Sequence, residues 1–294
     1  MKNIDIIAAC SDLGVHVNGS NLAPEILINN INISNKNKIK NINKIFKNKN
    51  YQKELEKNNK QKNLNEINKF NTNLYNSVIQ SLNNNCFPLT LGGDHSIAIA
   101  STLASIKKHK NLGIIWFDAH GDFHTFKTTN SGNIHGLPFA ALTHYEKNFL
   151  TDFHTGPFYN YKNAVLVGAR DIDKPDELQN LKDAGVTIFT TEDIKKLGVD
   201  IIYQKAFDIA SNGTNGVHIS YDLDVIDPQI APGVSIPAVN GISLDEAYSF
   251  LDYIIKSKDI IKSLDLVEFN PLTDIDTKAE KIATHILNEL LEKL

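Results

Sequence analysis

The fold class that the sequence predicts is α/β, with a parallel sheet covered by helices on both faces. Short apolar runs of strand length alternate with amphipathic stretches of helix length from residue 87 to the end of the chain. This alternation is typical of parallel sheets, because a helix is the usual crossover between parallel strands. Acidic side chains also follow several of the apolar runs. Ligands of parallel sheets bind beyond the carboxyl ends of the strands, where these acids would lie.

The chain is long and apolar enough to bury a full core. It has 294 residues, of which 41% are hydrophobic, and the even spacing of the apolar runs favours a single domain over residues 1–294. A net charge of −4 does not indicate the basic surface that binding of nucleic acid requires. No apolar run approaches the roughly 18 residues of a membrane span, and the polar N-terminus does not match a signal peptide. We therefore expect a cytoplasmic protein with neither a nucleic-acid nor a membrane partner.

The first third of the chain combines a strand, a loop and a biased segment. Residues 4–9 read as a buried strand, and a glycine-bounded loop and a short helix from Ala23 follow it. Asn and Lys then dominate residues 29–73, which predicts a solvated surface segment with one strand or helix. A basic partner-binding arm is the alternative, but asparagines carry no charge and glutamates interrupt the lysines. A helix is expected from Leu64, leading to a strand at 87–91.

The rest of the chain is regular. The helix at residue 243 has Ser243 and Glu246 at capping-box spacing, and the last helix repeats the spacing with Thr277 and Glu280. No internal repeat is found. The further strands are expected at 112–117, 164–169, 186–191, 217–224 and 263–269, and the further helices from Ser96 and over 138–145, 176–185 and 199–210.

The stretch WFDAHGDFHT (116–125) carries the strongest chemical signal. Asp118, His120 and Asp122 alternate directly after an apolar run, so a strand would place them on one side. Two bare carboxylates about 4 Å apart repel by roughly 4 kcal/mol at an effective dielectric near 20, so protons or cations must balance them. Metal is the simpler answer. The alternative is structural: one Asp caps a helix, and the His is a core residue bonded to the backbone.

Two further segments carry the same kind of residues. Asp222 and Asp224 end an apolar run, and His95 follows a Gly-Gly turn at the start of a helix. Four carboxylates carry the charge that two divalent cations would cancel. Carboxylates with two imidazoles and no thiolate favour Mn²⁺, although they also admit Co²⁺, Ni²⁺ or Fe²⁺. The candidate metal ligands are His95, Asp118, His120, Asp122, Asp222 and Asp224.

These segments carry a family resemblance. GGDHS (92–96), DAHGD (118–122) and SYDLDVIDP (220–228) resemble the three metal-binding signatures of the ureohydrolases, which include arginases, agmatinases and formiminoglutamases. The resemblance runs from about residue 87 to the C-terminus. It implies a three-layer α/β/α fold with a central, mostly parallel eight-stranded sheet, two Mn²⁺ per chain and a homotrimer or homohexamer. Three more segments, SGNIHGLP (131–138), GARDID (168–173) and VEFNP (267–271), are most similar to the arginase branch.

The metal pair suggests a hydrolytic reaction. Two divalent cations about 3.5 to 4 Å apart can share one water molecule and lower its pKa, which suits attack on a guanidinium carbon. Asp122 is expected to bridge the two metals. His135 is the candidate acid that protonates the leaving amine; the alternative is that it only bonds loop backbone. Glu268, at a predicted strand end, can pair bidentately with a guanidinium, and the alternative there is a structural ion pair.

The resemblance also implies how the rest of the substrate is bound. It assigns Ser131 and Asn133 to an α-carboxylate and Asp173 to an α-ammonium group. This chain departs from the arginase pattern at three positions. His124 stands where arginases commonly have Asn, Asp176 where a Glu is common, and Ile236 where many have Thr. His124 can still donate to a carboxylate, and we expect His124 and Asp176 to contact the substrate, whereas Ile236 removes a hydroxyl near the guanidinium end.

The leading hypothesis is a binuclear manganese hydrolase that converts L-arginine to L-ornithine and urea. The nearest alternative is another ureohydrolase, acting on agmatine, a guanidino acid or formiminoglutamate. A metal-stabilised module without activity is an alternative of another class. A two-metal phosphoesterase is a more distant one, because the sequence offers no added basic clamp for phosphate.

Overall fold

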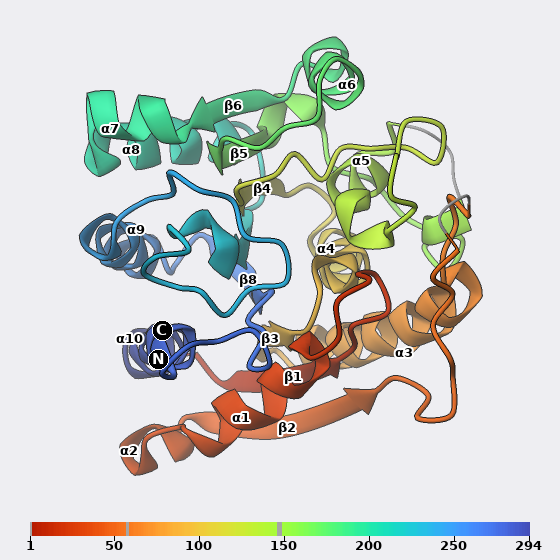
Figure 1. Cartoon of the computed structure of the whole chain (residues 1–294). Coiled ribbons are helices and arrows are strands. Elements are labelled where there is room, and N and C mark those ends of the chain that lie inside the picture. Colours follow the sequence, from red (N-terminus) through yellow and green to blue (C-terminus); the bar gives the residue numbers. More distant parts are fainter. Residues whose placement is uncertain (1, 57–58, 146–148) are drawn as a thin grey trace.

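The computed structural model describes residues 2–56, 59–145 and 149–294. Its centre is an eight-stranded sheet in the order β2-β1-β3-β8-β7-β4-β5-β6, and every neighbouring pair is parallel (Figure 1). The strands are β1 (Ile4–Cys10), β2 (Ile39–Phe46), β3 (Phe87–Gly92), β4 (Gly113–Phe117), β5 (Ala164–Ala169), β6 (Thr187–Thr190), β7 (Val217–Asp222) and β8 (Ile261–Val267).

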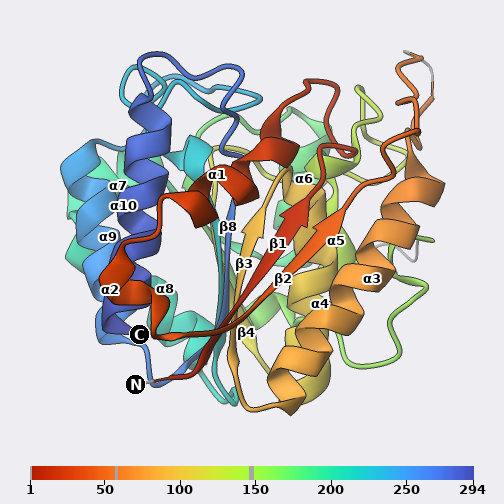
Figure 2. The same cartoon turned by 90° about the horizontal axis from the view of Figure 1, so that it is seen from below.

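Helices cover both faces of the sheet, which confirms the predicted three-layer fold (Figure 2). Buried residues of α1, α8, α9 and α10 pack on one face, and those of α3, α4 and α5 pack on the other. The helices are α1 (Ala23–Asn29), α2 (Ile33–Lys36), α3 (Leu64–Asn83), α4 (Ala98–His109), α5 (Pro138–Leu142), α6 (Asp176–Ala184), α7 (Thr191–Leu197), α8 (Val199–Ser211), α9 (Leu244–Lys256) and α10 (Lys278–Lys293).

The double cover explains why the strands read as continuous apolar runs. In β1, Ile4 and Ile6 join the core on one face, whereas Ile7 and Ala9 join the core on the other. Successive side chains of a strand point to opposite faces, so a strand covered on both sides favours apolar residues on both faces. All seven residues of β1 are buried.

The Asn/Lys-rich segment contributes an edge strand. β2 pairs with β1 alone and is mostly exposed or half-buried along its length. The segment then runs irregularly to α3, and its residues 57 and 58 lie outside the described residues. α3 begins at Leu64, as predicted, and buries Ile67, Phe70 and Leu74 on one face.

One of the two predicted capping boxes is present and the other is not. The capping box of Ser243 and Glu246 is present in α9, as expected. The box predicted for α10 is wrong, because Thr277 has φ 54° and its side chain makes no capping hydrogen bond. Asp274 replaces it: Oδ1 accepts from the Ala279 backbone N–H and Oδ2 from that of Glu280, both at 3.0 Å.

Helix α7 was missed altogether. A strand is expected to run to residue 191, but β6 ends at Thr190, which also caps α7 in a capping box with Asp193. The Thr-x-x-Asp spacing and Gly198 after the last turn were the available signals.

Asp274→Ala is expected to lower the free energy of unfolding by about 0.5 to 2 kcal/mol, because it leaves two backbone N–H groups of α10 without their cap. Chemical denaturation measures the change. Asp252→Ala is the matched control: it removes the same charge from an exposed position within α9, and its stability should stay constant or rise, because alanine favours helix. Equal losses in both variants would contradict the capping role.

Candidate metal centre and substrate cavity

The central strands of the sheet bring the predicted site together. β3, β8, β7 and β4 are consecutive neighbours in the sheet, although they are far apart in sequence. His95 follows β3, Asp118 follows β4, Asp222 ends β7 and Glu268 follows β8. Because the strands are parallel, their carboxyl ends meet at one edge, and so do these side chains.

The first acid–histidine group surrounds the His95 ring. Its Nδ1 lies 3.1 Å from Asp118 Oδ2, 3.2 Å from Asp122 Oδ2 and 3.0 Å from Asp222 Oδ2. The ring stacks on Trp116, with centroids 4.0 Å apart, and its Nε2 is 2.9 Å from the Ser220 hydroxyl. A hydrogen bond from Nε2 to Ser220 leaves Nδ1 as the ligand atom, which is how an outer partner orients a metal-binding histidine.

The second acid–histidine group surrounds His120. Its Nδ1 lies 2.9 Å from Asp224 Oδ2 and 3.4 Å from Asp118 Oδ1. Asp118 thus belongs to both groups, one oxygen facing each. Asp122, which is expected from the sequence to bridge two metals, lies in the first group only, so Asp118 has the position suited to bridging in this structure. The expected alternation fails because β4 ends at Phe117, so Asp118, His120 and Asp122 all lie beyond the strand, and the backbone of Asp122 has φ 47°.

The donor set fits divalent metal ions. Among the described residues, His95 Nδ1 and Asp122 Oδ2 are buried atoms without a hydrogen-bond partner. Burial, followed by the charge of Asp118, raises the pKa of Asp122 to about 7. Burial and the charges of Asp224 and Asp118 likewise hold the pKa of Asp222 well above its usual range. Bound cations would favour the ionised form of Asp122 and Asp222, and carboxylates with imidazoles suit Mn²⁺ and similar ions.

A cavity of about 250 Å³ opens beside the two groups. The structure brings most of the predicted residues to it, and Ile236, one of the three departures, also lines it. Its lining residues are His16, His120, Asp122, His124, Ser131, Asn133, His135, Gly136, Asp171, Asp173, Glu177 and Ile236.

Glu268 lies against His135, which lines the cavity. Its Oε1 accepts from the His95 backbone N–H at 2.7 Å and lies 3.3 Å from His135 Nδ1. Its Oε2 is buried and has no hydrogen-bond partner in the described part of the chain. Burial opposes ionisation of Glu268, but the hydrogen bond and charge of His135 outweigh it and lower the pKa of the carboxyl. Glu268 is therefore an anion with one oxygen available for a cationic ligand.

On the opposite wall of the cavity, the structure places a different residue from the one predicted. Asp176 is exposed at the start of α6 and does not line the cavity, whereas its neighbour Glu177 is buried and does. Glu177 accepts from the backbone N–H groups of Phe123 at 2.9 Å and Asp173 at 3.0 Å. A helix turns by about 100° per residue, so one position decides which side chain faces inward. Leu181, four residues after Glu177 and also buried, was the signal that could have identified it.

His124 and Asp173 meet on this wall. His124 Nε2 lies 3.1 Å from Asp173 Oδ2, and its Nδ1 lies 3.2 Å from the Thr128 hydroxyl. The two predicted substrate contacts therefore form a pair, which Glu177 supports through the backbone of Asp173.

Sequence reasoning missed three other residues near the cavity. His16 lies in the loop after β1, and its Nδ1 accepts from Asn133 Nδ2 at 2.9 Å. Asp171 lies 4.0 Å from His120 Nε2. Asp94 is buried and accepts from the backbone N–H groups of Gly14 and Ser96, so it joins the loop after β1 to the His95 turn. Two of them carried a signal in the sequence, Asp94 as part of the GGDHS segment and Asp171 as part of the GARDID segment.

A sequence model described as the arginase family matches residues 2–292. The chain belongs to the arginase family. The arginase of Brevibacillus brevis is 41% identical over 228 residues, which cover 76% of this chain and 75% of that protein. The arginase of Bacillus subtilis (strain 168) is 40% identical over 208 residues, which cover 70% and 69%. The structure of arginase from Bacillus caldovelox has a TM-score of 0.92 at 31% identity, with 100% of this chain and 99% of that chain covered.

Membership of the arginase family confirms the predicted resemblance and agrees with the observed sheet. Within the described residues, no helix has both the length and the apolar character needed to cross a bilayer.

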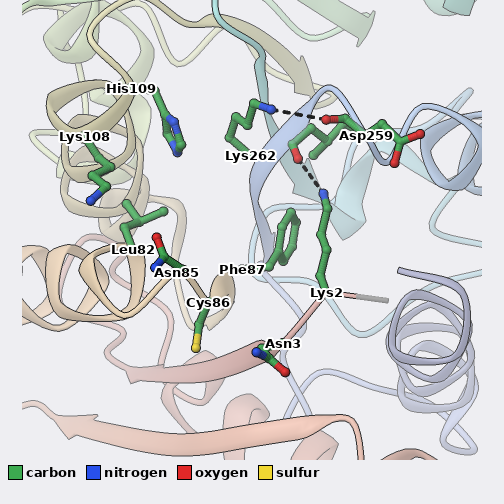
Figure 3. A pocket seen from close by; sticks show the side chains of 11 residues that line it. Lys2, Asn3, Leu82, Asn85, Cys86, Phe87, Lys108, His109, Asp259 and Lys262 are labelled. Atoms are coloured by element: carbon green, nitrogen blue, oxygen red, sulfur yellow. Dashed lines mark hydrogen bonds between the residues drawn. The ribbon is translucent and has the colours of Figure 1, made fainter.

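A second cavity of this arginase-family chain, of about 390 Å³, lies at the other end of the sheet (Figure 3). It is lined by residues at the amino ends of strands, such as Lys2 before β1, Phe87 at the start of β3 and Ile261 at the start of β8. Lys2 Nζ donates to the Ile261 carbonyl at 2.7 Å and lies 4.4 Å from the centre of the Phe87 ring. Burial, with the nearby charge of Lys262, lowers the pKa of Lys2 to about 8. This cavity has lysines where the first has acid–histidine groups, and it lies at the opposite edge of the sheet from them.

Proposed function

We propose that this protein hydrolyses the guanidinium group of L-arginine to give L-ornithine and urea. The observation that carries the proposal is a single cavity bounded by two acid–histidine groups and by His135, which contacts the carboxylate of Glu268. Two relatives at 40% identity or more are arginases by name, which supports the same reaction. The proposal treats residues 1–294 as one catalytic domain.

The acid–histidine groups are proposed to hold two Mn²⁺ ions. His95, Asp118, Asp122 and Asp222 would hold one, and Asp118, His120 and Asp224 the other. Bound in this way, the two ions would lower the pKa of a water molecule and so supply a nucleophile at neutral pH. Four carboxylates offset the charge of the ions, so a cationic guanidinium is not repelled from the cavity.

Glu268 and His135 are proposed to act on the guanidinium. Glu268 Oε2 has no protein partner in the described residues and can accept a guanidinium N–H. His135 Nδ1 faces Glu268 Oε1, which leaves the ring Nε2 to give a proton to the departing amine. Because Glu268 contacts both the His95 backbone and His135, it also holds the proton donor beside the first acid–histidine group.

The opposite end of the cavity is proposed to bind the amino-acid head group. Ser131, Asn133 and His124 would donate to the α-carboxylate, and Asp173 would accept from the α-ammonium. Glu177 acts through the backbone: it accepts from the Asp173 and Phe123 N–H groups and so positions Asp173 and His124. Asp176 has no part in this proposal.

One observation favours a second candidate substrate. Asp173 is already 3.1 Å from His124, and Ile236 lines the cavity without a hydroxyl. Both features differ from what the arginase pattern implies, so agmatine or another guanidino compound is the rival. A homotrimeric or homohexameric assembly and a cytoplasmic location stay predictions.

The test is a substrate panel on protein loaded with Mn²⁺. Release of urea, or of formamide from formiminoglutamate, is measured for L-arginine, agmatine, a guanidino acid and formiminoglutamate. We expect the highest kcat/KM for L-arginine. A higher value for any other substrate would assign the protein to that reaction, and no turnover of any of them would favour a metal-stabilised module without activity.

Asp173→Ala is expected to lower kcat/KM for L-arginine by about tenfold or more, because the α-ammonium loses a charged partner near the cavity wall. The same variant should change kcat/KM for a guanidino compound without an α-ammonium by less than about threefold. Asp176→Ala is the matched control and should behave as the unmodified protein, since Asp176 is exposed. Equal losses on both substrates would place head-group recognition elsewhere.

A further inference from the structure

We propose that His16 is a specificity-determining residue for the substrate carboxylate, and that the Asn/Lys-rich segment positions it and the Ser131 loop through Lys53 and Lys62. This inference rests on the proposed function. It gives a role to the one biased segment of the sequence, whose described parts between β2 and α3 are residues 47–56 and 59–63.

Lys53 closes the loop that carries His16. Its ammonium donates to the carbonyls of Val15 at 3.1 Å and Val17 at 3.3 Å, the two residues on either side of His16. It also pairs with the buried Asp12 at 3.2 Å, and Asp12 in turn accepts from the Gly19 backbone N–H. The Lys53 side chain is only 9% exposed, and a buried ammonium is stable only where such partners surround it. The loop between residues 12 and 19 is therefore held at both ends and around His16.

Lys62 holds the second loop. Its Nζ donates to the Ser131 carbonyl at 2.5 Å, and Lys60 donates to the Lys127 carbonyl at 2.9 Å. Lys62 is 7% exposed. The chain also packs closely here, because a Cβ added to Gly132, whose φ is +71°, would lie 2.0 Å from the Asn59 carbonyl oxygen. Residues 59–62 thus fix the position of the loop that carries Ser131 and Asn133.

The two lysines belong to one folded unit. The Glu54 carboxylate accepts from the Asn59 side chain at 2.8 Å and from the Asn63 backbone, and the Glu54 N–H donates to the Asn63 side chain at 2.7 Å. Asn63 also donates to the Leu13 carbonyl at 2.8 Å. These hydrogen bonds join the part of the segment that contains Lys53 to the part that contains Lys62. The segment contacts both the His16 loop and the Ser131 loop, which lie on the same side of the molecule in Figure 1.

The His16 ring has a hydrogen-bond donor, Nε2, available for a ligand in the cavity. Asn133 Nδ2 donates to His16 Nδ1, so the proton of the neutral ring sits on Nε2. The side chain lines the cavity together with Ser131 and Asn133, which are the proposed carboxylate contacts. A hydrogen bond from Nε2 to a carboxylate adds a fourth donor to Ser131, Asn133 and His124, and this donor has its position only while Lys53 holds residues 15 and 17.

The test compares binding and turnover in six variants, one of which is a control. His16→Ala, Lys53→Met and Lys62→Met are each expected to raise KM for L-arginine and the calorimetric Kd of L-ornithine about tenfold, while kcat changes less than about threefold. His16→Gln keeps an amide donor near the position of Nε2, and Lys62→Arg keeps a cationic donor, so both should restore most of the affinity. Lys49→Met is the matched control: Lys49 is exposed in the same segment, and it should leave KM and Kd unchanged.

The outcomes separate this inference from the proposed function. If the unmodified protein does not hydrolyse L-arginine, the proposed function fails, and the L-ornithine Kd still decides the inference. Unchanged Kd in the His16→Ala variant overturns it, as does a fall in kcat with KM and Kd constant, or the absence of L-ornithine binding by the unmodified protein. If the methionine variants unfold, as thermal unfolding would reveal, Lys62→Arg and His16→Ala carry the test.

Discussion

Replacing Asp118 by alanine is expected to remove metal from both acid–histidine groups and to lower kcat on L-arginine by at least about 1000-fold. The physical reason is that Asp118 has one oxygen beside His95 and the other beside His120, so neither group keeps its full set of donors. Loss of a metal-activated nucleophile removes several kcal/mol of transition-state stabilisation, which corresponds to a rate loss of about this size.

Elemental analysis of purified protein dialysed against Mn²⁺ measures the first part of this prediction, and urea release measures the second. Asp122→Ala is the informative comparison, because Asp122 belongs to the first group only. We expect about two Mn²⁺ in the unmodified protein, about one in Asp122→Ala and none in Asp118→Ala. Two bound ions in Asp118→Ala would disprove the shared position of this carboxylate.

Glu268→Ala is expected to lower kcat/KM for L-arginine by about 100-fold or more while both metal positions stay filled. Glu268 is buried, and its Oε2 has no hydrogen-bond partner among the described residues, so its removal would leave a bound guanidinium without a counter-charge. Truncating one partner of a buried, hydrogen-bonded charge pair costs about 2 to 5 kcal/mol. His135 also loses its partner at Nδ1, so orientation of the proton donor is weakened in the same variant.

The measurement pairs steady-state kinetics with elemental analysis of the same sample. Glu268→Gln is the matched variant: it keeps the shape and one acceptor for the His95 N–H but lacks the charge, so its loss should be nearly as large. Full activity in Glu268→Gln would mean that the carboxylate serves the fold alone. A loss of metal in either variant would instead place Glu268 among the residues that maintain the acid–histidine groups.

Much of the site could be predicted because strand ends are visible in the sequence. An apolar run that stops at a carboxylate marks the carboxyl end of a buried strand, and four such ends carry His95, Asp118, Asp222 and Glu268. The parallel sheet then requires these ends to lie at one edge. Membership of the arginase family agrees with this expectation.

Two residues were wrongly assigned from the sequence, each at the start of a helix, where the local backbone conformation decides which side chain makes the contact. Glu177 and not Asp176 reaches the cavity, because α6 starts one residue earlier than the inward-facing position. Asp274 and not Thr277 caps α10, because Thr277 adopts a left-handed conformation in which its side chain makes no capping hydrogen bond. Neither the phase of a short helix nor a positive φ at a non-glycine residue is encoded by the type of residue alone.

The sequence by itself determined the fold class, the strand ends and the chemical nature of the site. Those features depend on residue type and on spacings of two to four positions, which local geometry converts directly into structure. Only the tertiary structure decided that Asp118 lies in both acid–histidine groups and that Lys53 and Lys62 reach the two loops beside the cavity. These contacts join segments separated by dozens of residues, so they depend on sheet order and on loop packing, which no local pattern contains.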